Sequence, residues 1–197
     1  MRAAERDETV RTAWRTEVAA LDPTTLVFVD ECGTHTAMTP RSGRAPRGER
    51  AVGRAPRNHG PNVSLLAALT PDGMGPALVV EGATDRPAFT AYVGGALVPS
   101  LRPGQTVVLD NLRVPKNEEI RTLVEEAGCH LLFLPPSSPD FAPIELAFAK
   151  VKQALRRAEA RSFQTLVAAI GQALDAVSTA DARGFFAHCG YPLPRTN

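Results

Sequence analysis

The sequence predicts an α/β fold in which helices cover a mixed β-sheet. Three short apolar runs, residues 26–30, 106–110 and 129–135, have the length and composition of strands buried on both faces of a sheet. Two further runs joined by a Pro-Asp-Gly turn predict an antiparallel hairpin. A hairpin joined to parallel strands through helical crossovers gives a mixed sheet covered by helices.

The N-terminal part of the chain predicts a surface helix, a strand and a long irregular segment. Residues 3–21 carry apolar side chains at helical spacing among charges, at Val10, Trp14, Val18 and Leu21. Asp22 and Pro23 end this helix. The first buried strand, LVFVD, follows at 26–30. From Gly33 to Pro61 the pattern breaks into Gly, Pro and Arg, which is typical of a loop or an exposed hairpin.

The middle of the chain predicts the hairpin and the crossover helices. The hairpin strands are residues 62–70 and 75–82. Residues 86–101 predict a helix with Phe89, Val93 and Leu97 on one stripe, weakened by a pair of glycines. The strands at 106–110 and 129–135 are joined by a helix predicted at 116–127.

The C-terminal part predicts three helices, over residues 144–158, 163–177 and 179–189. The first has a core stripe made of Ile144, Phe148, Val151 and Leu155. Glu145, Lys152 and Arg156 lie on an adjoining face, because seven residues nearly complete two helical turns.

Bulk properties indicate a cytoplasmic, soluble domain. The 197 residues suit a single domain, and a net charge of +1 gives no whole-chain argument for nucleic acid. The three cysteines lack a CxxC spacing, which fits a reducing compartment. The charged N-terminus has no signal-peptide pattern, and no apolar run is long enough to span a membrane.

Three carboxylates form the candidate catalytic and metal site. Asp30 and Asp110 each follow four apolar residues at the predicted C-terminal end of a strand, and parallel strands bring such ends together. Glu145 follows a proline-rich stretch that limits where the last crossover helix can begin. Carboxylate oxygens without histidine or thiolate suit Mg²⁺, with Mn²⁺ able to substitute, and two such ions can drive phosphodiester cleavage. The alternative is that each aspartate is only a turn former.

The motifs VFVDECG, VVLDNL and LPPSSPDFAPIE, in this order, closely resemble the catalytic domain of DDE transposases, in the bacterial insertion-sequence branch related to mariner elements. The resemblance extends over residues 10–191, and the 34 residues between Asp110 and Glu145 are typical of that branch. It implies an RNase H-like (retroviral-integrase-like) fold, two divalent ions, and DNA strand cleavage and transfer by Asp30, Asp110 and Glu145.

Two positions depart from the family pattern. Pro115 stands where the family usually has a histidine, five positions after Asp110, and Ser137 stands where it has a tyrosine. Proline is acceptable at the first position of a helix. Any role of that histidine in the site is absent here.

The irregular segment after the first strand is the candidate DNA-binding element. Residues 40–61 hold six arginines against one glutamate. Guanidinium groups suit bidentate contact with phosphate, although a solvated loop without a partner is the plain alternative. By resemblance, residues 34–60 reach over DNA and a partner protomer. The predicted DNA contacts are Arg41, Arg44, Arg47, Arg50, Arg54, Arg57, Lys152 and Arg156.

Two Cys-His pairs, at 129–130 and 188–189, match no zinc spacing and are interpreted as structural. Glu31 lies next to Asp30 but faces away by strand alternation, so it is left out of the site.

The predicted organisation is a linker helix at 1–22 and a catalytic domain at 23–191, with residues 34–60 as an inserted loop. The family's N-terminal helix-turn-helix region is not found in this sequence, which leaves a frameshift product, a truncated remnant or an isolated catalytic domain as explanations. The expected partners are double-stranded DNA, both element ends and target, and a second copy of the chain in the synaptic complex. The competing interpretations are an inactive fragment that binds DNA or dimerises, and a cellular RNase H-like nuclease.

Overall fold

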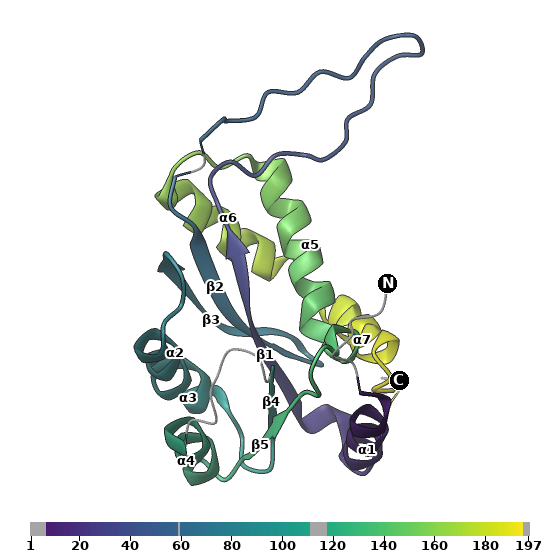
Figure 1. Cartoon of the computed structure of the whole chain (residues 1–197), viewed down its shortest axis with the longest axis vertical. Helices are drawn as coiled ribbons and strands as arrows, with labels where there is room; N and C mark the ends of the chain where they lie inside the picture. The colour runs from purple at the N-terminus through teal and green to yellow at the C-terminus, as the bar shows by residue number, and fades with distance from the viewer. Residues whose placement is uncertain (1–6, 59, 111–117, 195–197) are drawn as a thin grey trace.

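A five-stranded mixed sheet forms the centre of the molecule (Figure 1). The computed structural model describes residues 7–58, 60–110 and 118–194. The strand order is β3-β2-β1-β4-β5, with β1 parallel to β4, β4 parallel to β5, and β2 antiparallel to both β1 and β3. The strands are β1 (Leu26–Thr34), β2 (Val63–Thr70), β3 (Gly73–Glu81), β4 (Thr106–Leu109) and β5 (His130–Phe133). The predicted mixed sheet is confirmed.

Helices cover both faces of this sheet and create two separate apolar cores. One face packs against α1 (Glu8–Ala19), α5 (Pro143–Ala158), α6 (Phe163–Asp175) and α7 (Thr179–His188). The other packs against α2 (Arg86–Tyr92), the π-helical turn η2 (Val93–Leu97) and α4 (Glu118–Glu126). The short elements η1 (Pro23–Thr25), α3 (Val98–Ser100) and η3 (Pro139–Phe141) complete the described chain.

Strand β1 is longer than predicted. It continues four residues beyond Asp30, because β2 reaches past the end of β4 and pairs with β1 as far as Thr34. The prediction that Asp30 ends its strand is therefore wrong, although the parallel pairing with β4 does stop just before Asp30. Asp30 consequently lies inside a strand, where its backbone pairs with β2 on one side only.

Strand β5 differs from its prediction in burial. It lies at the sheet edge, and its residues range from half-buried to exposed rather than buried on both faces. An edge strand has a neighbouring strand on one side only, so its apolar side chains remain partly exposed to solvent. Cys129, just before the strand, is buried.

The predicted crossover helices are present with changed bounds. Residues 86–100 are helical throughout but pass through the π turn η2, which contains Gly94 and Gly95. Val93 and Leu97 are buried against the sheet, as the stripe predicts. Helix α4 is described from Glu118, and residues 116–117 of its prediction lie outside the described residues.

Helix α1 is shorter than the predicted 3–21, of which residues 3–6 lie outside the described part. Its outer face is exposed at Val10, whereas Trp14 and Val18 are buried in the core that also holds α5. Within the described residues, no helix has both the length and the apolar character needed to cross a membrane.

The segment between β1 and β2 projects from the body as a long excursion, and its described residues, 35–58 and 60–62, contain no helix or strand (Figure 1). Its described residues from 40 to 58 are all exposed. The predicted loop is confirmed.

Helix α5 joins the core to the candidate site, and its apolar stripe is confirmed because Ile144, Phe148, Val151 and Leu155 are all buried.

We expect Phe148→Ala to lower the free energy of unfolding by roughly 3–5 kcal/mol in urea titrations, because it leaves a cavity beside the sheet. Val52→Ala, at a side chain that is 86% exposed, is the matched control and should change it by less than about 0.5 kcal/mol. A small loss for Phe148→Ala would contradict this packing.

Candidate active site

The sheet register brings Asp30 and Asp110 next to each other. Strands β1 and β4 run parallel with Val29 opposite Leu109, so the next position on each chain is an aspartate. Both side chains are half-buried. In a parallel pair the carboxyl ends of the strands share one edge, where the chemistry of open α/β sheets is found.

Strand alternation decides which face each acidic side chain occupies. Asp30 lies on the same face as Phe28 and Cys32, which belong to the core beneath α5. Glu31 lies on the opposite face, where its Oε1 accepts a hydrogen bond of 2.8 Å from the Ser64 hydroxyl. Glu31 thus faces away from Asp30, as strand alternation predicts. The Asp30 carboxylate accepts a hydrogen bond of 2.7 Å from the Glu31 backbone N–H.

Glu145 enters the site from the first turn of α5 and is exposed. Pro143 is the first residue of the helix, where a missing N–H costs nothing and the fixed φ suits the helix. The positive end of the helix dipole favours a carboxylate in this turn. Helix α5 thus begins at a defined residue and carries Glu145 at its start.

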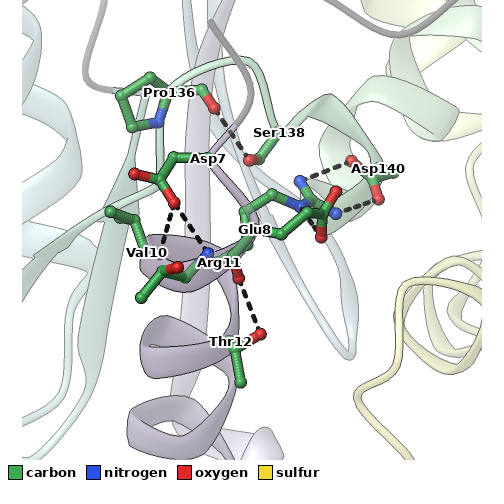
Figure 2. A network of polar contacts seen from close by, with 9 residues as sticks. Asp7, Glu8, Val10, Arg11, Thr12, Pro136, Ser138 and Asp140 are labelled. Atoms are coloured by element: carbon green, nitrogen blue, oxygen red, sulfur yellow. Dashed lines mark hydrogen bonds and ion pairs between the residues drawn. The ribbon is translucent and has the colours of Figure 1, made fainter.

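A buried arginine from α1 holds the segment that leads into α5 (Figure 2). The Arg11 side chain is fully buried, and its two terminal nitrogens donate to the two oxygens of Asp140, at 3.1 and 2.6 Å. Its Nε lies 3.5 Å from a carboxylate oxygen of Glu8. Paired, charge-assisted hydrogen bonds of this kind are stronger and more directional than neutral ones.

The residue after Asp140 is held by aromatic contacts. The Phe141 ring stacks on Trp14 with centroids 5.2 Å apart and an interplanar angle of 7°, and the Arg11 guanidinium lies 3.9 Å from its centroid. The Tyr191 hydroxyl donates a hydrogen bond of 2.7 Å to the Phe141 carbonyl. We refer to Arg11, Trp14, Asp140, Phe141 and Tyr191 as the clamp. It fixes the backbone four residues before Glu145.

Sequence reasoning missed the clamp, although a signal was present. Arg11, Trp14 and Val18 follow the 3–4 residue spacing of one helix face, so Arg11 falls on the apolar stripe. A charged residue on such a stripe predicts a buried partner, since an isolated buried charge is very costly.

Sequence reasoning also gave no role to Cys32, which lies two residues after Asp30. Its thiol is buried, and this burial raises its pKa. The Lys152 side chain interacts with the thiol and lowers that pKa, whereas the Asp30 and Glu145 carboxylates raise it. Cys32 belongs to the core beneath α5, the helix that carries both Glu145 and Lys152.

The chemistry of the three carboxylates fits hard divalent cations. Among the residues that the structure describes, no three acidic, histidine or cysteine side chains are gathered closely enough to hold one ion. Carboxylates that are close to one another repel by several kcal/mol per pair at an effective dielectric of about 20, so side chains standing apart are expected without a cation. Asp30, Asp110 and Glu145 therefore have the ligand chemistry that a hard divalent cation requires. Their side chains would have to move closer together to bind one ion.

The predicted DNA contacts lie in three places. Arg41 and Arg156 line one groove at the distal part of α5, and Lys152 lies beside Cys32. The remaining arginines lie on the exposed excursion, at positions 44, 47, 50, 54 and 57.

Of the two departures from the family pattern, Pro115 lies outside the described residues. Ser137 has a φ of 54°, a left-handed conformation that few residues other than glycine adopt. The neighbouring Ser138 hydroxyl donates to the Pro136 carbonyl at 3.1 Å, which tightens this turn (Figure 2).

Comparison with known proteins supports the fold. The family model described as DDE superfamily endonuclease matches residues 25–167. No curated protein matches the chain. Among solved structures, the fold is similar to that of the protein in a pre-cleavage Mos1 transpososome, with a TM-score of 0.73 and 16% identity over 95% of this chain and 59% of that one. The chain thus spans under two thirds of that protein.

Two further structures show the same fold. The Mos1 mariner paired end complex with Mn gives a TM-score of 0.69 at 16% identity, covering 94% of this chain and 58% of that one. The catalytic domain of Mos1 mariner transposase gives 0.62 at 13% identity, covering 93% of this chain and 86% of that one. The RNase H-like architecture is therefore confirmed.

The clamp predicts an asymmetry between two substitutions. Asp140→Ala removes the acceptor of both terminal nitrogens of the fully buried Arg11 guanidinium, and should cost about 3–5 kcal/mol of unfolding free energy. Arg11→Met leaves the Asp140 carboxylate, which is 47% exposed and can be hydrated, so it should cost less, about 1–3 kcal/mol. Urea unfolding of both variants measures the difference, and an equal or reversed order would refute the clamp as described.

Proposed function

The chain belongs to the DDE superfamily of endonucleases, and on this basis we propose that it is a transposase catalytic domain that cleaves a DNA strand at the end of an insertion sequence and joins the end to target DNA. Asp30, Asp110 and Glu145 are the proposed catalytic carboxylates. The proposed place of action is the bacterial cytoplasm, on nucleoid DNA.

One observation carries this proposal. The β1–β4 register sets Asp30 beside Asp110 at the carboxyl ends of two parallel strands. Helix α5 packs on the same face of the sheet as Phe28 and carries Glu145 in its first turn, which supports a common site for the three carboxylates.

The proposed cofactor is a pair of Mg²⁺ ions, for which Mn²⁺ can substitute. Asp30, Asp110 and Glu145 would hold them, and bound ions would supply a water of lowered pKa and charge stabilisation for an in-line displacement. The protein's own contribution is to orient the carboxylates: the sheet holds two of them, and the clamp and Pro143 set the position of the third.

Two partners are proposed. One is double-stranded DNA, and the other is a second copy of the chain in a synaptic complex. The exposed arginine-rich excursion, Lys152 and Arg156 supply cations on the side of the molecule that carries α5 (Figure 1). The similar solved structures include a transpososome and a paired-end complex, which are assemblies of those longer proteins. Their similarity supports the proposal for this chain.

A second function is favoured by a specific observation. Pro115 stands where the family usually has a histidine, so any role of that histidine in the site is absent here. A folded chain that binds DNA or dimerises without cutting it is the alternative.

The direct test is nicking of supercoiled plasmid in Mg²⁺ and in Mn²⁺. We expect metal-dependent nicking that Asp110→Asn lowers at least about 100-fold, because loss of a carboxylate ligand weakens metal binding and removes charge needed to position the ions. Asp175→Asn, at an exposed residue of α6, is the matched control and should retain activity. Salt-sensitive DNA binding without nicking by the unaltered chain would instead support the inactive alternative.

A further inference from the structure

A basic groove lies between the root of the arginine-rich excursion and the distal half of α5. It is lined by Pro40, Arg41 and Ser42 from the excursion and by Gln153, Arg156 and Arg157 from α5. Arg157 was not among the predicted DNA contacts. Arg41 is far in sequence from the adjacent Arg156 and Arg157 and meets them only in the folded chain.

The wall formed by the excursion is anchored. Met38 is buried in the core, and the Arg161 guanidinium donates to the Thr36 and Met38 carbonyls, at 3.0 Å each. Arg161 is itself paired with Glu159 at 2.8 Å, next to the end of α5. The residues just before Pro40 are thereby tied to the α5–α6 connection, so the groove is part of the folded body.

The groove carries uncompensated positive charge. Its other cation, Lys150, is ion-paired with Asp181 of α7. Arg41, Arg156 and Arg157 form no ion pair or side-chain hydrogen bond with any residue in the described ranges 7–58, 60–110 and 118–194. Like charges held together repel, and this cost is offset when an anion occupies the space between them.

A purely structural explanation accounts for only part of this arrangement. Arg156 and Arg157 lie in the last turn of α5, where cations interact favourably with the helix dipole. Arg41 belongs to the exposed excursion and not to the end of a helix, yet it lines the groove with these two arginines. An anionic ligand explains the presence of all three.

We propose that this groove binds the phosphodiester backbone of double-stranded DNA, at a point remote from the cleaved bond; this rests on the proposed function. Guanidinium groups match the geometry of phosphate oxygens, and the Ser42 hydroxyl and Gln153 amide add neutral donors. DNA is favoured over an acidic protein because α5 carries Glu145 of the candidate active site at its other end.

The length of α5 sets the spacing of the two contacts. Glu145 and Arg156 are eleven residues apart on one helix, which corresponds to about 16 Å at a rise of about 1.5 Å per residue. Duplex DNA running along α5 advances about 3.4 Å per base pair. The groove therefore contacts a backbone phosphate about five base pairs from the cleaved bond.

The test is the salt dependence of duplex binding by the full chain, measured by fluorescence anisotropy with a labelled 25-base-pair duplex and no divalent metal. We expect Arg157→Gln to make the slope of log Kd against log salt shallower by about 0.9, the value for one lost phosphate contact. Arg121→Gln is the matched control, since Arg121 is paired with Glu125 on α4, and its slope should equal that of the unaltered chain.

A second pair of variants covers the case in which Arg157→Gln alters folding. Gln153→Glu places a carboxylate within the groove and should weaken binding at low salt, whereas Gln172→Glu, at an exposed position of α6, should not. Thermal unfolding of all four variants checks that each is folded.

The outcomes separate this proposal from the proposed function. If the unaltered chain binds and nicks DNA while Arg157→Gln and Gln153→Glu keep its slope and affinity, the groove proposal is overturned and the function stands. If the variants instead shift only the monomer–dimer equilibrium in sedimentation, the groove receives a second copy of the chain and the DNA proposal fails. If the slope changes as expected but no nicking occurs, the groove stands and the proposed catalysis fails.

Discussion

The ion pair between the buried Arg11 guanidinium and Asp140 is the constraint on which the geometry of the candidate site depends. The sheet alone places Asp30 and Asp110, because adjacent parallel strands fix their register. Glu145 has no such support, since it lies on the first turn of a helix after a segment without regular pairing. The clamp supplies the missing restraint by fixing Asp140 and Phe141, and the prolines of residues 135–143 reduce the conformations that remain.

This arrangement makes helix α5 both a core element and a functional one. Its buried stripe packs on the sheet, its first turn holds Glu145, and its last turn lines the basic groove. A core helix is rigid because its apolar side is closely packed. The distance between Glu145 at one end of α5 and Arg156 and Arg157 at the other is therefore set by one rigid helix. It does not depend on the conformation of a loop.

Much of the fold and of the candidate site could be predicted from the sequence. Asp30, Asp110 and Glu145 stand out because each directly follows a strong local pattern, an apolar strand or a proline-rich entry to a helix. The clamp could not be predicted in the same way, because Arg11 and Asp140 are 129 positions apart and their pairing depends on how α1 packs. The extra length of β1 and the edge position of β5 were missed for a related reason, since both follow from strand order in the sheet, a long-range property.

The most direct test is an anomalous-scattering map from crystals of the chain bound to duplex DNA and soaked in Mn²⁺, compared with crystals of Asp140→Ala. The account predicts manganese peaks bounded by Asp30, Asp110 and Glu145 in the unaltered chain, and loss of the Glu145 contact when the clamp is broken. Manganese bound by the two aspartates with Glu145 turned away in the unaltered chain would contradict the central claim. The same contradiction would follow if Glu145 kept its place in Asp140→Ala.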